Sequence, residues 1–162
     1  MALIVEDGSG ILNANSFASL DYIKAYMLAR GIALPVDVRI EQFSTFAIDY
    51  MNTLEFVGER VLIDLPFPRT NIILASGQSL PSDTIPTNIV RAQAQLIADQ
   101  ARGVELLPTS NPQAQMKRSK VGPIEREYFA ISEVGPNIPV AQAMLDPLLR
   151  GHGSFSIRTV RV

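Results

Sequence analysis

The sequence predicts a mainly α-helical protein: a small bundle of about four helices with an extended β-arm or hairpin and an extended C-terminal tail. Apolar residues recur every three or four positions in several segments, which is typical of amphipathic helices. Proline and glycine interrupt the chain between them, over 59–84 and 104–112. The last residues alternate, which indicates a strand. We expect a helical domain over 1–150, including a β-arm at about 113–132, and then a hinged tail strand over 151–162.

The segment 85–103 is predicted to be the central helix of the bundle. Pro86 suits the first turn of a helix, where its missing N–H has no intrahelical partner, and Gly103 suits a left-handed cap. The apolar positions between them form one broad stripe: Ile89, Val90, Ala92, Ala94, Leu96, Ile97 and Ala101. Because so apolar a helix must be covered, we expect the other segments to pack around it.

Two helices are expected before the central one. Ser19 is a good N-cap for a helix over 20–30, which Gly31 would end. Its inward side chains are predicted to be Tyr22, Ile23, Tyr26 and Met27. The second helix is predicted over 36–56, and its apolar face consists of Ile40, Phe43, Ala47, Tyr50, Met51 and Leu54.

The stretch 59–84 is predicted to be irregular, because Pro66 and Pro68 cannot lie in a helix interior. A loop this long is usually either functional or draped over the core. A last short helix is expected over 140–149, where Pro147 makes its end irregular.

The segment 115–131 is expected to be extended. Gly122-Pro123 either turns a hairpin there or marks a bulge in one long strand. In a hairpin, the cationic residues of the first strand would face acidic residues of the second across the ladder. The cations are Lys117, Arg118 and Lys120, and the acids are Glu125 and Glu127.

The tail after Gly151 alternates strictly. Phe155, Ile157, Thr159 and Arg161 fall on one side, and Ser156, Arg158, Val160 and Val162 fall on the other. A strand beyond a glycine hinge is suited to pairing with another subunit or a partner. Closure of a small sheet within the same chain is an equally good interpretation at this stage.

No enzyme is indicated by the sequence. His152, the single histidine, lies next to Ser154 in a glycine-flanked stretch, but neighbours in such a segment do not supply the fixed nucleophile–base–orienter geometry of catalysis. The chain has no cysteine, and its carboxylates show no metal-ligand spacing. No nucleotide-binding motif is present. We therefore expect no catalytic, metal or cofactor-binding residues and no cofactor.

Composition and charge limit the classes of partner that the chain is expected to bind. No apolar run reaches the roughly 20 residues that span a bilayer, and no secretory signal pattern opens the chain, so we expect no membrane association and synthesis in a cytoplasm. Residues 1–112 have a net charge of −5, whereas residues 113–162 have +3. This asymmetry is consistent with nucleic acid, an acidic partner, self-association between unlike surfaces, or an ordinary mixed surface.

Six short segments, taken in order, resemble a known family. They are Asn15-Ser16-Phe17, Gly58-Glu59-Arg60, Leu65-Pro66-Phe67-Pro68-Arg69, Ile85-Pro86, Lys120-Val121-Gly122-Pro123-Ile124 and Leu145-Asp146-Pro147-Leu148-Leu149. Their order and spacing resemble the head–tail connector (adaptor) proteins of tailed bacteriophages, a family also labelled as DnaT-like single-stranded-DNA-binding proteins. At the position of Phe67 the family commonly has tryptophan. This chain departs from the family pattern there, but phenylalanine keeps an aromatic anchor.

The resemblance implies a structural virion protein at the neck of the particle. Such a connector forms a homo-oligomeric ring, usually twelve-fold, between the portal protein and a tail-side neck or tail terminator protein. Double-stranded DNA passes through its channel without sequence-specific binding. The alternative is a single-stranded-DNA-binding replication accessory protein, but the aromatics Tyr22, Tyr26, Phe43, Phe46 and Tyr50 lie at helical spacing that predicts core positions rather than a stacking surface.

Two sets of residues are candidate contacts. The tail residues expected to bind the portal or a neighbouring subunit are Phe155, Ile157, Arg158, Val160, Arg161 and Val162. The arm residues expected to contact a neighbouring subunit or line the DNA channel are Lys117, Arg118 and Lys120. An ordinary solvated strand face is the competing interpretation of the second set.

Overall fold

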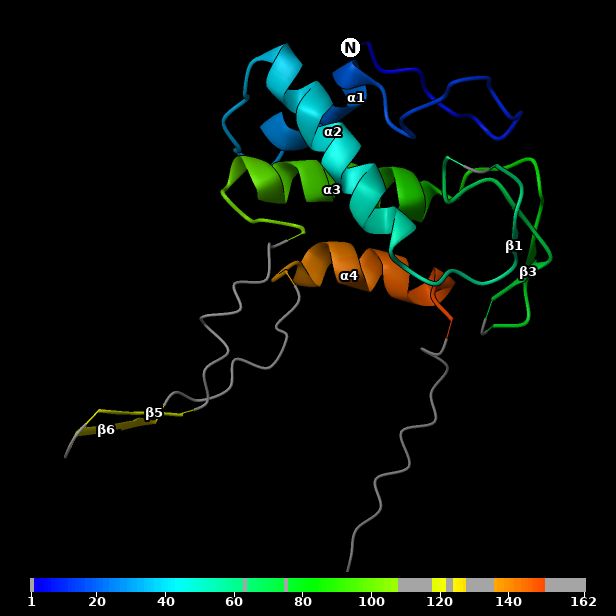
Figure 1. The fold of residues 1–162 in the computed structure, drawn as a ribbon. Coiled ribbons are helices and arrows are strands. Elements are labelled where there is room, and N and C mark those ends of the chain that lie inside the picture. Colours follow the sequence, from blue (N-terminus) through cyan, green and yellow to red (C-terminus); the bar gives the residue numbers. More distant parts are fainter. Residues whose placement is uncertain are drawn as a thin grey trace, which may run out of the picture.

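The computed structural model describes residues 2–62, 64–74, 76–107, 118–121, 124–127 and 136–150. It is mainly helical, as the sequence predicts, and the described helices are α1 (Leu20–Leu28), α2 (Asp37–Asn52), α3 (Thr87–Ala101) and α4 (Pro139–Leu145). A 3₁₀ turn, η2 (Asp146–Leu148), follows α4 directly. Figure 1 shows α3 between α2 on one side and α4 on the other.

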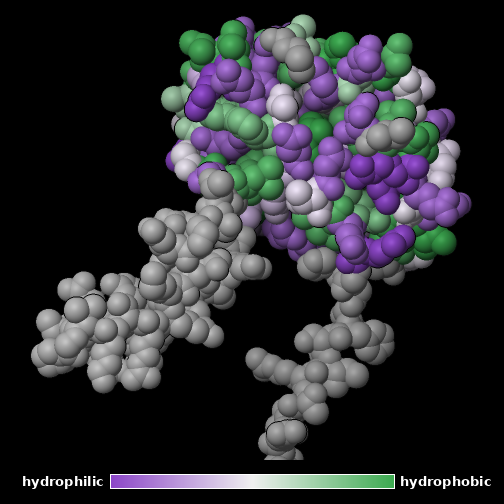
Figure 2. All heavy atoms as spheres, in the orientation of Figure 1, coloured by the Kyte–Doolittle hydropathy of each residue, from purple (hydrophilic) through white to green (hydrophobic). Residues whose placement is uncertain are grey.

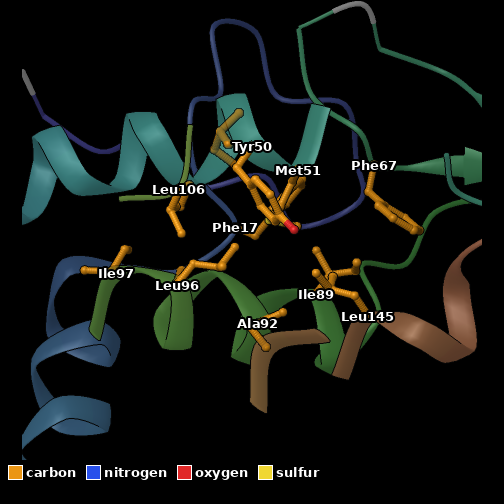
Figure 3. Packing of buried hydrophobic residues seen from close by; sticks show 14 of the residues in the cluster. Phe17, Tyr50, Met51, Phe67, Ile89, Ala92, Leu96, Ile97, Leu106 and Leu145 are labelled. Atoms are coloured by element: carbon orange, nitrogen blue, oxygen red, sulfur yellow. The ribbon is translucent and has the colours of Figure 1, made fainter. Parts of the chain in front are cut away.

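Helix α3 is the centre of the core, which confirms the prediction for 85–103. Its residues from Ala92 to Gln100 are all buried, and Ile89 is completely inaccessible. Figure 3 shows side chains of α3 directed at Tyr50 and Met51 of α2 and at Leu145 of α4. Gly103 has a left-handed φ of 93° and ends the helix as predicted.

Helix α1 begins where the sequence predicts. The Ser19 side chain accepts a hydrogen bond from the Tyr22 N–H, which is the expected N-cap bond. Ile23, Tyr26 and Met27 face inward, but Tyr22 is 37 % exposed, so its predicted core position is wrong. Tyr22 lies against the ring of Tyr26, with 6.3 Å between the ring centroids, and so covers the core residue from outside.

Helix α2 is shorter than predicted, because it ends at Asn52 rather than near residue 56. The residues after it turn away to meet the end of the described chain: Phe56 forms an antiparallel bridge with Leu149. That tertiary pairing takes the backbone out of the helix. Phe46, also predicted to be in the core, is 51 % exposed.

The long stretch after α2 contains two small antiparallel sheets. Strand β1 (Glu59–Arg60) pairs with β2 (Arg69–Thr70), and β3 (Ile72–Ile73) pairs with β4 (Ser79–Leu80). Between β1 and β2, Phe67 is fully buried and meets Phe56 edge to face, with 5.1 Å between the centroids. The Phe67–Pro68 peptide is cis. This stretch therefore covers one end of the core.

Helix α4 and η2 replace the single helix predicted over 140–149. The regular α-helix ends at Leu145, and Pro147 lies inside the 3₁₀ turn. The segment is then joined to the loop after α2, because the Val57 N–H donates to the Leu148 carbonyl at 2.9 Å and the Arg150 N–H donates to the Glu55 carbonyl at 2.7 Å.

The predicted arm contains a hairpin rather than one bulged strand. Strand β5 (Arg118–Val121) pairs antiparallel with β6 (Ile124–Glu127), and Gly122-Pro123 joins them. Figure 1 shows this hairpin away from the four helices. The predicted tail strand, 151–162, lies outside the described residues. None of the helices that the structure describes is long and apolar enough to cross a membrane.

Candidate interaction surface

The structure places two of the predicted contact residues. Arg118 and Lys120 lie in β5, where Arg118 is opposite Glu127 and Lys120 is opposite Glu125, as the hairpin interpretation predicted. Opposite charges at facing positions stabilise an antiparallel ladder modestly. Lys117 lies outside the described residues, as do all the tail residues of the predicted portal or neighbour site: Phe155, Ile157, Arg158, Val160, Arg161 and Val162.

The helical body has an open depression beside α2, which we call the α2 groove. It has a volume of about 430 Å³ and is lined by Arg39, Phe43, Phe46, Asp49, Gln100 and the segment 103–107. Phe46 is 51 % exposed and Leu107 is 46 % exposed, so both rims offer apolar surface. Figure 2 shows that apolar residues also interrupt the polar surface on the face of the body drawn there.

The groove follows from the spacing of one helix and the turn after another. Arg39, Phe43, Phe46 and Asp49 are four, three and three positions apart, so they form a line along the outer side of α2. The Gln100 side chain joins the two walls, because its Nε2 donates to the Phe43 carbonyl at 2.9 Å. Gly103 then turns the chain back past α2.

Charge is distributed unevenly along the α2 groove. The Arg39 guanidinium lies over the Phe43 ring, 4.8 Å from its centroid, and Nη1 donates to the Gln42 side chain at 3.3 Å. Asp49 and Glu105 are exposed, and no ion pair within the described part of the chain involves either of them. The groove thus combines two apolar rims with two solvated carboxylates and one cation, Arg39, so its charged groups carry a net charge of −1.

A second cation–aromatic contact joins Tyr26 of α1 to Arg30, just after the end of the helix. The Arg30 guanidinium covers the Tyr26 ring, 3.4 Å from its centroid, and the Tyr26 hydroxyl donates to Gln95 at 2.9 Å. Burial raises the pKa of Tyr26, although the charge of Arg30 opposes this. Because the Tyr26 ring is already covered and only 7 % exposed, it offers no free face to a nucleic-acid base.

The described helical body, 2–107 and 136–150 without positions 63 and 75, is acidic. It contains eight Lys or Arg and thirteen Asp or Glu. Single-stranded-DNA sites combine a positive groove with stacking aromatics. Within the described residues no cluster of carboxylates and histidine could hold a metal ion.

Comparison with known proteins decides the family. The family model described as "Putative DnaT-like ssDNA binding protein" matches residues 1–162. The chain belongs to this family. The DnaT-like assignment agrees with the second label noted from the sequence motifs, and it names no virion component. Searches of curated proteins and of solved structures found no match.

Sequence reasoning missed three buried polar residues that position the elements of this DnaT-like chain. Gln93 is fully buried on α3 and hydrogen-bonds to the entry of α1 and to α2. Glu6 accepts from the N–H groups of Gly8, Gly10 and Ile11 at 2.7–2.8 Å, so its carboxylate organises the N-terminal loop. The signal for the loop was the pair of glycines that follows an acid.

Arg69 is the third missed residue. Its guanidinium donates to the carbonyls of Phe56, Val57, Gly58 and Pro66 at 2.8–3.3 Å. Burial, followed by the nearby positive charges of other arginines, lowers the pKa of Arg69. The family motif contained this arginine, but its role as a clamp of loop carbonyls needed the three-dimensional structure. These three residues are structural, which leaves the α2 groove and the hairpin as candidate contact surfaces.

Proposed function

We propose that the protein is a non-enzymatic assembly subunit, a head–tail connector that forms a ring between the portal and the tail of a bacteriophage particle. The main support is the division of charge along the chain: an acidic helical body precedes a basic C-terminal third. A closed ring needs two unlike surfaces on each subunit that fit one another. The order of the motifs that resemble connector proteins supports the same role.

The proposed partners follow from this role. The subunit would contact the portal protein on one side and a tail-side neck protein on the other, and double-stranded DNA would pass through the channel without sequence-specific contacts. The β5–β6 hairpin supports a contact role, because it pairs with no other strand of the described chain. The protein would act in the neck of the virion after synthesis in the host cytoplasm.

Single-stranded-DNA binding is the second candidate, and the description of the family favours it. The acidic body argues against a DNA groove on the helices, so this function would depend on the basic residues that follow residue 112. DNA binding through lysine and arginine weakens strongly as salt increases. If the protein binds single-stranded DNA, its affinity for DNA should therefore fall strongly as the salt concentration increases.

One pair of measurements separates the candidates. The mass of the purified protein is measured by light scattering, alone and after mixing with the portal protein of the same phage, and single-stranded DNA is titrated at two salt concentrations. We expect a large defined ring or a portal complex, with weak DNA binding. Tight, salt-sensitive DNA binding by a small species that ignores the portal would reject the connector role.

A further inference from the structure

We propose that the α2 groove is the binding site for the C-terminal segment 154–162 of a neighbouring copy of this chain. This inference rests on the proposed ring for the source of the segment. The groove itself rests on independent observations: its volume of about 430 Å³, its two apolar rims and its two carboxylates. Exposed apolar surface of this kind beside charged groups is typical of a protein-binding site.

The residues that line the α2 groove determine which side chains a bound segment needs. Phe46 and Leu107 each keep about half of their surface in water. Burying the remainder under apolar side chains removes that surface from water, which is favourable. Asp49 and Glu105 add a requirement for positive charge, since covering them with a neutral segment would cost desolvation without a compensating partner.

The C-terminal segment meets both requirements. It reads Ser-Phe-Ser-Ile-Arg-Thr-Val-Arg-Val, with four large apolar side chains (Phe155 and Ile157 on one side of a strand, Val160 and Val162 on the other), two arginines and no acid. The other long stretches outside the described residues do not combine these features. Residues 108–117 contain one cation and a single large apolar side chain, and residues 128–135 contain an acid and no cation.

The chain length allows the segment to reach a neighbour. Twelve residues follow Arg150, and at about 3.3 Å per residue they can span roughly 40 Å. For comparison, the 15-residue central helix α3 is about 22 Å long. The segment is therefore long enough to pass beyond its own subunit, which a joint between ring subunits requires.

Engineered disulfides test the proposal with the full chain, because the natural sequence has no cysteine. Leu107→Cys at the rim of the groove is mixed with isotopically heavy chain that has Thr159→Cys, under mild oxidation. Val61→Cys is the matched control, since Val61 is 52 % exposed but lies beside β1 rather than in the groove. Disulfides form only between side chains about 4 Å apart at Cβ, so the yield of mixed dimer reports docking.

We expect the mixed dimer to exceed the Val61→Cys control by about tenfold, which corresponds to a docking preference of about 1.4 kcal/mol. Asp49→Arg with Glu105→Arg should remove that excess, and Arg158→Glu with Arg161→Glu in the other chain should restore it. Equal yields from groove and control would overturn the proposal. So would a double variant, Leu107→Cys with Thr159→Cys, that closes within its own chain.

The outcome is distinguishable from failure of the proposed function. A normal ring with the portal together with equal disulfide yields would refute the groove contact and leave the connector role intact. Absence of any ring in the unmodified protein, alone and with the portal, would instead refute the connector role.

Discussion

The side-chain oxygen of Gln93 on α3 accepts a hydrogen bond of 2.8 Å from the backbone N–H of Phe17, 76 positions earlier in the chain. The same oxygen accepts from the Ala18 N–H at 3.0 Å, and the amide nitrogen donates to Ser16 Oγ at 3.0 Å and to Ser44 Oγ at 2.8 Å. One buried amide thus joins the entry of α1 and the middle of α2 to the central helix.

Replacement of Gln93 by leucine should therefore be severe. In Gln93→Leu, the N–H of Phe17 would stay buried without its acceptor, the N–H of Ala18 would keep only its bond to Ser16 Oγ, and the Ser16 and Ser44 hydroxyls would lose their amide donor; we expect a loss of about 2–4 kcal/mol in the free energy of unfolding. Urea denaturation measures it. Gln42→Leu, the same change at an exposed position of α2, should alter stability by less than about 0.5 kcal/mol. Similar effects at both positions would contradict the importance of the network.

The Arg69 clamp makes a second prediction. Lysine has the charge but not the planar fork that reaches several carbonyls, so Arg69→Lys should destabilise the protein by about 2 kcal/mol. Thermal unfolding followed by circular dichroism measures the loss. Arg91→Lys, at an exposed position on α3, is the matched control and should be nearly neutral. A neutral Arg69→Lys would show that the carbonyls find other donors.

Asp99 gives a prediction about pH. Burial raises the pKa of Asp99, although a hydrogen bond from Gln95 and the charge of Arg102 oppose this. The carboxyl of Asp99 therefore binds a proton more tightly in the folded state than in the unfolded state. As pH rises from the pKa of the unfolded state through the pKa of the folded state, this difference should lower the free energy of unfolding. Asp99→Asn should remove that loss, so the stability of the variant relative to the natural protein should increase between acidic and neutral pH.

The size of the Asp99 effect at neutral pH should be modest. Asp99 lies near the C-terminal end of α3, where a negative charge opposes the helix dipole by about 0.3–1 kcal/mol. Asp21→Asn is the control, because Asp21 lies in the first turn of α1 and its charge should stabilise that helix. Urea midpoints at pH 4 and pH 7 measure both. Lower stability of Asp99→Asn at pH 7 would contradict the prediction.

A substitution at Phe46 should affect self-association without affecting folding. Because its side chain is half exposed, Phe46→Ser should change the free energy of unfolding by less than about 1 kcal/mol, yet weaken self-association. Ile48→Ser, two positions along α2 at a buried site, should cost about 3 kcal/mol or more. Sedimentation velocity over a range of concentrations measures the association. Unchanged association in Phe46→Ser would exclude the groove as an interface.

The hairpin allows a charge test that preserves its pairing. The double variant Arg118→Glu with Lys120→Glu places like charges at the facing positions of β5 and β6. Adding Glu125→Lys and Glu127→Lys restores opposite charges at these positions, with the acids now in β5 and the cations in β6. If β5 contacts a partner through its cations, both variants should lose ring or portal binding in light-scattering measurements. Recovery in the fourfold variant would show that only hairpin pairing matters.

The sequence predicted the helices well where local signals were strong. Ser19 and Gly103 marked the boundaries of α1 and α3, and the apolar stripe of α3 identified the central helix. The end of α2 was wrong because a tertiary bridge, Phe56 with Leu149, overrides local propensity. Periodicity alone could not show that Phe46 is exposed, since a residue at core spacing is buried only where another segment covers it.

The candidate site was less predictable for a physical reason. The α2 groove is made by residues more than fifty positions apart, such as Phe43 and Gln100, and no local pattern encodes their contact. The facing charges of the hairpin were predictable, because the hairpin interpretation already placed cations of the first strand opposite acids of the second. The Gln93 network gave no signal in the sequence, because glutamine is seldom buried and the pattern of apolar residues in α3 does not include it.

The bond from the Arg150 N–H to the Glu55 carbonyl also has a mechanical consequence. Tension applied to the chain beyond residue 150 acts first on this bond and on the adjoining bridge of Phe56 with Leu149. From there the load passes to the strip 56–58, whose carbonyls are held by the Arg69 guanidinium. A pull on the C-terminal segment is thus shared between α4 and a braced loop at one end of the molecule.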